Sequence, residues 1–181
     1  MFEALKARLK QHEGVIPYLY LDSLGIVTTG VGHALFTAAY AVHLPFMRPS
    51  SLMASSDDIL AEYNAVRQLK SDELPGYYEI RTTLRLSGAA IDDLLDQDVV
   101  TLQHDLTAFL PGLPTYPAPA QEALLDMAFQ LGAHGLVEKF THMIADVMAQ
   151  NWPACADNCH REGIAQWRND ATKQLFLQAA A

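Results

Sequence analysis

The sequence predicts an α+β, mostly helical protein with a small hairpin-containing lobe, a long connecting helix and a larger helical lobe. Three observations predict this fold class. Residues 18–33 alternate like short strands behind an N-terminal helix, residues 87–110 form one long amphipathic pattern, and helical periodicity dominates after the proline-rich stretch 111–119. A chain of 181 residues can supply one substantial core or two small lobes that share a long element.

The composition is that of a globular protein and argues against nucleic acid or membrane as a partner. Half of the residues are apolar and 18% are charged, while 21 acidic against 12 basic residues give a net charge of −9. No stretch approaches the roughly 18 apolar residues of a membrane span, and the first ten residues lack the apolar segment of a signal peptide. We therefore expect a protein made in the cytoplasm that needs help to act elsewhere.

The N-terminal helix brings a carboxylate onto an apolar face. Phe2, Leu5 and Leu9 share one face of a helix for which Gly14 is a plausible stop. Glu13 follows Leu9 by four residues, so it lies on the same face at the end of the helix. A partly shielded carboxyl group suits a general acid, whereas a frayed last turn would leave Glu13 in water.

A β-hairpin follows, with its turn at residues 22–25. Asp22 stands at the mouth of this turn, where an aspartate usually accepts hydrogen bonds from turn amides. Together with Glu13 it forms a pair of carboxylates in unlike surroundings, which is the arrangement that glycoside hydrolysis requires. Gly30-Val31-Gly32 lacks the third glycine and the helix of a dinucleotide fingerprint, so we reject that interpretation.

The middle of the chain predicts one further helix and an irregular stretch. Ser55-Ser56-Asp57-Asp58 is a helix-start signal, and apolar spacing continues the helix to Lys70. Leu74-Pro75-Gly76 then breaks the chain. The alternation over residues 80–86 fits either a strand or an irregular approach to the next helix.

Ser87 is the predicted cap of the long helix, which runs to about Leu110. Its apolar stripe consists of Ile91, Leu94, Leu95, Leu102, Leu106 and Phe109. Asp98 points along this stripe, and a buried acid needs a partner. His33 is a candidate, in which case the two would form a structural ion pair.

Beyond residue 119 we expect helices at 120–132, 136–149, 153–161 and 164–178. The only cysteines, Cys155 and Cys159, are too few for a disulfide framework and are best explained as two small buried side chains. A zinc site built from them and His160 would need a fourth ligand, and a disulfide in an oxidising compartment stays an alternative.

The motifs of the first 33 residues resemble those of the phage-type lysozymes, glycoside hydrolase family 24. The family pattern corresponds here to Glu13-Gly14, Tyr20-Leu21-Asp22, Thr28 and Gly30-Val31-Gly32-His33. Further similarity lies in Asp96-Gln97-Asp98-Val99, the stretch 124–132, Phe140-Thr141, Trp152 and the stretch 168–177. Two positions depart from the pattern, because Ala34 replaces an expected leucine and Met143 an expected serine, which puts the subsite preference in doubt.

The resemblance implies a role for each matching residue. Glu13 would be the general acid, Asp22 would act on a water molecule, and the hydroxyl of Thr28 would help to hold that water. The remaining assignments are a structural ion pair of His33 with Asp98, cleft contacts from Phe129, Gln130 and Asn158, and an arginine directed towards Glu13, for which Arg168 is the counterpart. A solvated surface arginine is the alternative for Arg168.

The resemblance also implies a division of the chain. The small lobe would comprise residues 14–86, with an extension at 34–86 that contains the added helix Ser56–Lys70. The connecting helix would span 88–110, and residues 1–13 and 100–181 would form the helical lobe, with the cleft between the lobes.

The implied function is a monomeric muramidase that hydrolyses the β-1,4 bond between N-acetylmuramic acid and N-acetylglucosamine in bacterial peptidoglycan, with inversion and without a metal or organic cofactor. It would act in the periplasm, either as a phage endolysin after release or as an antibacterial effector domain that has delivery machinery and an immunity protein. The acidic charge favours the delivered domain. The alternatives are a catalytically silent wall-binding or partner-binding module and a zinc amidase that uses the cysteines.

Overall fold

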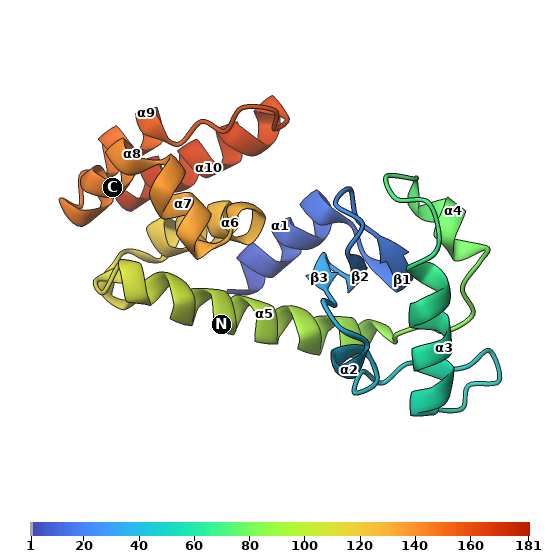
Figure 1. The fold of residues 1–181 in the computed structure, drawn as a ribbon. Helices are drawn as coiled ribbons and strands as arrows, with labels where there is room; N and C mark the ends of the chain where they lie inside the picture. Colours follow the sequence, from blue (N-terminus) through green and yellow to red (C-terminus); the bar gives the residue numbers. More distant parts are fainter. Residues whose placement is uncertain (1) are drawn as a thin grey trace. The chain divides into compact units, whose positions relative to one another are not determined.

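The structure, a computed structural model, describes residues 2–181 and has an α+β fold that is mostly helical with one three-stranded antiparallel sheet (Figure 1). The chain divides into two compact units. One consists of the residues up to Arg8 together with Asp98–Ala181, and the other of Leu9–Gln97. The boundaries fall inside α1 (Glu3–Glu13) and inside α5 (Gly88–Phe109). No helix among residues 2–181 is long and apolar enough to cross a bilayer.

The predicted end of the first helix is confirmed. Helix α1 ends at Glu13, and Gly14 adopts a left-handed conformation with φ of 79°. The Gly14 N–H donates to the carbonyl oxygen of Lys10 at 3.1 Å, the single bond of the left-handed helix end. This glycine turns the chain directly into the first strand.

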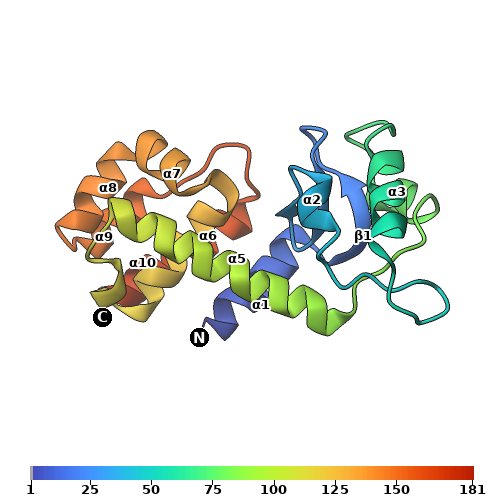
Figure 2. The same ribbon diagram turned by 60° about the horizontal axis from the view of Figure 1, so that its bottom comes forward.

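The hairpin is confirmed as well. Strands β1 (Ile16–Leu21), β2 (Val27–Gly30) and β3 (His33–Ala34) lie in the order β1-β2-β3, with all neighbours antiparallel. Tyr20 of β1 stands directly opposite Thr28 of β2. The short helices of the same unit are α2 (Ala38–Ala41), α3 (Ser56–Val66) and α4 (Pro75–Glu79), and both α3 and α4 pack against β1. Figure 2 shows α3 beside β1.

Two predictions for this region need correction, and of the two alternatives for residues 80–86 the irregular one is confirmed. Ser55 caps α3 in a reciprocal pair with Asp58, as the signal predicted, but the helix ends at Val66 instead of Lys70. Pro75 begins α4 where a break was expected, because a proline fits the first turn of a helix. Residues 80–86 form no strand and contribute only an isolated bridge between Arg85 and Met47.

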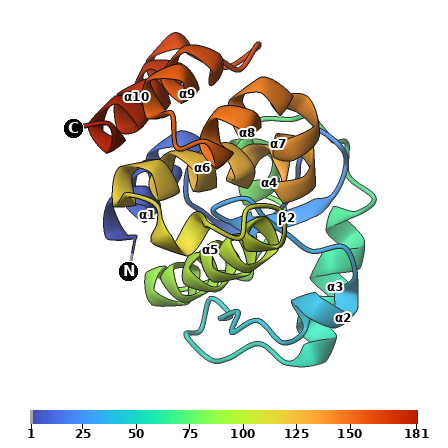
Figure 3. The same cartoon turned by 90° about the vertical axis from the view of Figure 1, so that its left-hand side faces the viewer.

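The long helix begins as predicted, with the Ala90 N–H donating to the Ser87 hydroxyl at 3.1 Å. Most of its predicted stripe is buried, although Phe109 at its end is exposed. The following elements are a 3₁₀ turn at Leu113–Thr115 and the helices α6 (Ala118–Leu131), α7 (Ala133–Lys139), α8 (Thr141–Met148), α9 (Trp152–Asn158) and α10 (Gln166–Ala179). Helix α10 packs against α6 and α9 (Figure 3).

The helix predicted at 136–149 is two helices. Phe140, with φ of −116° and ψ of 44°, ends α7 and begins α8. The two cysteines are confirmed as buried side chains, and both thiols are free rather than bridged. Burial raises the pKa of the Cys155 thiol to about 12, so this thiol stays protonated and unreactive near neutral pH.

Candidate active site

Three predicted catalytic residues, Glu13, Asp22 and Thr28, all belong to the unit Leu9–Gln97. Glu13 is the last residue of α1 and is half-buried, which disagrees with a frayed turn in open water. Asp22 and Thr28 come from the hairpin that begins two residues after Gly14. The tight left-handed helix end is therefore what brings a helical carboxylate and a hairpin together.

Asp22 holds the turn of the hairpin. Its Oδ1 accepts the N–H of Leu24 at 2.9 Å and the N–H of Ile26 at 2.8 Å, which confirms the turn interpretation. Both bonds use Oδ1, so the turn leaves Oδ2 for other chemistry. The carboxylate is half-buried and its orientation is fixed by the backbone around it.

Thr28 is buried in β2, with 3% of its surface exposed. Its hydroxyl donates to the carbonyl oxygen of Ile26 at 3.0 Å. Because the single hydroxyl hydrogen is used in this bond, the oxygen can act towards a further ligand only as an acceptor.

Tyr20 lies close to these groups, although the sequence analysis gave it no role. It stands directly opposite Thr28 in the sheet, so the two side chains share one face, and Asp22 follows it two residues later, just beyond the end of β1. Burial raises the pKa of Tyr20 to about 12, and the charges of Asp22 and then Glu13 add to the effect. Both carboxylates are therefore within electrostatic reach of one phenol. The spacing of two residues between Tyr20 and Asp22 was the feature of the sequence that could have indicated this position.

No hydrogen bond of the described residues 2–181 uses the Tyr20 hydroxyl. Its ring packs against that of Tyr78, with ring centroids 6.2 Å apart. Tyr78 belongs to α4 and is completely buried, and its hydroxyl donates to the carbonyl oxygen of Lys70 at 2.8 Å. Helix α4 therefore packs directly against the Tyr20 ring.

The other predicted residues lie in the unit that includes Asp98–Ala181, with the exception of His33. His33 belongs to Leu9–Gln97 and Asp98 to the other unit, and their ion pair stays a prediction. Arg168 is only 7% exposed, so the alternative of a solvated surface arginine is wrong. Its proposed approach to Glu13 likewise stays a prediction.

A buried polar network that the sequence analysis missed surrounds Asp126 of α6. Arg161, which is 3% exposed, donates to Asp126 at 3.0 Å and to the Thr172 hydroxyl at 2.8 Å. Arg168 Nη2 lies 3.9 Å from the other oxygen of Asp126. The signal was an acid in the middle of the apolar run LLDMAF, because a buried carboxylate requires partners.

The predicted substrate contacts Phe129, Gln130 and Asn158 are all at least partly accessible. Gln130 accepts a hydrogen bond from Arg161 at 3.2 Å, and Asn158 donates to Asp146 at 2.9 Å. Of the two departures from the family pattern, Ala34 is half-buried in β3. Met143 is completely buried, so its side chain belongs to the packing of its unit and not to a ligand-contacting surface.

Comparison with known proteins assigns no family to this chain. No family model matches the chain, and no curated protein is significantly similar to it. Among residues 2–181, no group of three or more histidine, cysteine, aspartate or glutamate side chains is arranged to hold a metal ion.

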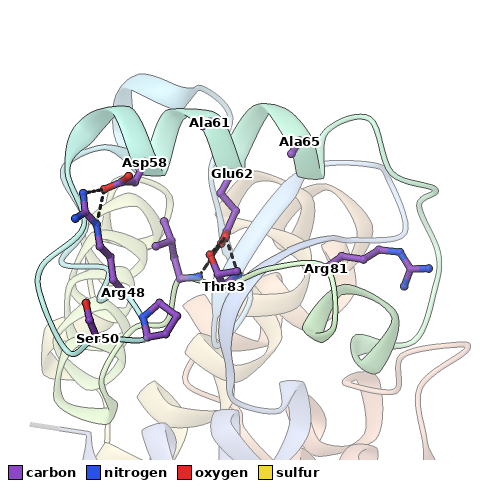
Figure 4. A pocket seen from close by; sticks show the side chains of 10 residues that line it. Arg48, Ser50, Asp58, Ala61, Glu62, Ala65, Arg81 and Thr83 are labelled. Atoms are coloured by element: carbon purple, nitrogen blue, oxygen red, sulfur yellow. Dashed lines mark hydrogen bonds and ion pairs between the residues drawn. The ribbon is translucent and has the colours of Figure 1, made fainter.

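A separate open groove of about 670 Å³ lies on the added segment between α3 and the residues before α5. Its charged groups already serve the fold (Figure 4). Arg48 donates to Asp58 at 2.8 Å, while Glu62 accepts from the N–H and the hydroxyl of Thr83 at 2.7 and 2.9 Å. Arg81 points away from the groove and stacks on Tyr77. The groove contains no spare charge to direct towards a ligand.

Proposed function

We propose that this protein is a muramidase with a two-lobed lysozyme fold that hydrolyses the β-1,4 bond between N-acetylmuramic acid and N-acetylglucosamine in peptidoglycan. One observation carries the proposal. A half-buried glutamate at a helix end and an aspartate fixed in a hairpin turn both act electrostatically on the same tyrosine, with a threonine hydroxyl opposite that tyrosine. Two carboxylates in unlike surroundings are what the reaction needs.

The proposed reaction divides the work between the two carboxyl groups. Glu13 donates its proton to the glycosidic oxygen as the bond to the anomeric carbon breaks and its electron pair moves to that oxygen. Asp22 takes a proton from a water molecule whose lone pair forms the new bond on the opposite face of the sugar. Thr28 helps to hold this water. The configuration is inverted, and transfer of a proton from Asp22 back to Glu13 through solvent completes the cycle.

The remaining sequence assignments complete the proposal. Phe129, Gln130 and Asn158 would contact the sugar chain, Arg168 would approach Glu13, and His33 with Asp98 would form a structural ion pair. The net charge of −9 opposes attraction to an anionic wall. An enzyme delivered to or released at its substrate fits this charge, as an effector domain or as an endolysin.

The substitution Glu13→Gln tests the proposal. It keeps the size and hydrogen-bonding capacity of the side chain and removes the proton that the leaving oxygen needs. We expect release of reducing ends from purified Gram-negative peptidoglycan to fall by at least the roughly 10² to 10⁴ that a general acid contributes. Circular dichroism should show the same spectrum for both proteins. Equal activity of the variant would contradict the role of Glu13.

A second candidate function is a wall-binding module without catalysis. The acidic charge and the replacement of the expected leucine by Ala34 motivate this alternative. Retention on sacculi in a sedimentation assay, without release of reducing ends by the wild-type chain, would establish this second function in place of the first.

A further inference from the structure

We propose that Tyr20 is a third polar group of the catalytic site and holds the attacking water by donating its phenolic hydrogen to it, together with Asp22 and Thr28. This inference rests on the proposed muramidase function and goes beyond it, because it assigns a catalytic role to Tyr20. Without that role, the presence of this tyrosine would be explained by the packing of β1 alone.

The hydrogen bonds available to the water lead to this role. The Thr28 hydroxyl has used its hydrogen on Ile26, and Asp22 as a carboxylate carries none, so both groups can only accept. A water between them donates both of its hydrogens. Its two lone pairs remain, of which one attacks the anomeric carbon and the other needs a donor.

Tyr20 supplies such a donor from the correct side of the sheet. As the direct cross-strand partner of Thr28, its Cβ lies about 4.5–5.5 Å from that of Thr28. Asp22 follows two residues later, roughly 6.8 Å along the chain and just beyond the end of β1, and its carboxylate is near enough for its charge to act on the phenol. The Tyr20 hydroxyl makes no hydrogen bond within residues 2–181, so its hydrogen is unused.

The electrostatic environment keeps this hydrogen in place. Burial and the carboxylates of Asp22 and Glu13 raise the pKa of Tyr20 to about 12. The phenol therefore stays neutral over the pH range in which a carboxyl pair works, and a neutral phenol is an O–H donor.

The added segment fixes the position of the donor. The contact of the Tyr20 ring with Tyr78 of α4, together with the bond from Tyr78 to Lys70, limits the movement of the phenol. Tyr78 is thus a positioning residue, which acts only through Tyr20. This gives the segment 34–86 a part in holding the site.

The test compares Tyr20→Phe with a matched control, Tyr63→Phe. Both substitutions remove one hydroxyl from the same unit, but the Tyr63 hydroxyl donates to the carbonyl oxygen of Leu35 and is completely enclosed in the core. With solubilised peptidoglycan strands as substrate, we expect Tyr20→Phe to lower kcat about tenfold or more at nearly constant KM. Tyr63→Phe should keep the wild-type kcat. Thermal unfolding of both variants shows whether the fold is retained.

Each other outcome is decisive. An active wild type with an unchanged kcat in Tyr20→Phe overturns the role of Tyr20 and leaves the muramidase proposal standing. A rise in KM at constant kcat makes Tyr20 a substrate contact, and an equal loss of kcat in both variants makes the effect structural; either result overturns the inference. A wild type that releases no reducing ends overturns the proposed function, and the role of Tyr20 falls with it.

Discussion

At the scale of single residues, Asp22 combines a structural role with a proposed chemical one. Its Oδ1 fixes the hairpin turn through two amide hydrogens, while Oδ2 takes no part in the turn. The turn therefore orients the carboxylate before any substrate binds, and preorganised groups of this kind contribute most to catalysis.

Two substitutions of Asp22 separate these roles. Asp22→Asn keeps an oxygen that accepts from Leu24 and Ile26, so the free energy of unfolding should change by no more than about 0.5 kcal/mol while activity falls by about 10² or more. Asp22→Ala removes the acceptor for both amides and should lower stability by about 1–3 kcal/mol as well. Urea unfolding and reducing-end release measure the two effects. Loss of stability in the asparagine variant equal to that in the alanine variant would contradict this division.

The residues of the candidate site that have a local signature could be predicted from the sequence, whereas those that depend on pairing between distant segments could not. Glu13 and Asp22 could be identified from the sequence because a helix stop and a turn are local patterns. Tyr20 looked like an ordinary aromatic residue of a strand. Its position relative to Thr28 depends on the register between two strands, which the sequence does not reveal. Arg161 was missed because its partner Asp126 lies 35 residues away.

At the scale of elements, the end of α1 positions the proposed acid, and Gly14 makes that end possible. A Cβ at Gly14 would meet nothing within 4 Å, so only its φ of 79° opposes substitution. We expect Gly14→Ala to lower the free energy of unfolding by about 1 kcal/mol and to reduce activity, since Glu13 loses its fixed orientation.

Gly88→Ala is the matched control. Gly88 also has open space around its Cβ position, but it begins α5 without a positive φ. An alanine there should leave stability unchanged or raise it slightly. Urea unfolding of both variants provides the comparison, and equal effects would refute a specific requirement for the left-handed conformation at Gly14.

Hydrophobic periodicity alone did not predict every helix boundary. The caps at Ser55 and Ser87 were predicted because hydroxyl and carboxylate caps are read directly from sequence. The division between α7 and α8 was missed because Phe140 is apolar and neither glycine nor proline marks it. Pro75 was taken for a break because one proline residue signals a helix start and a helix end equally well.

At the scale of the whole molecule, the segment 34–86 and the acidic charge are the two features that bear on the proposed function. Helices α3 and α4 pack on β1, so the extra residues support the hairpin and, through Tyr78, the proposed site. The net charge of −9 should make encounter with an anionic wall unfavourable at low ionic strength. The charge fits the proposal that access to the wall depends on delivery or release.

The central claim is that this chain adds a water to the muramyl bond of peptidoglycan, and the products test it most directly. Sacculi digested with the wild-type chain should release muropeptides that end in reducing N-acetylmuramic acid, identified by mass spectrometry after borohydride reduction. Such ends require a water at the anomeric carbon, which the site around Asp22, Thr28 and Tyr20 is proposed to hold. Products that end in 1,6-anhydromuramic acid, in reducing N-acetylglucosamine or in free stem peptides would contradict the account.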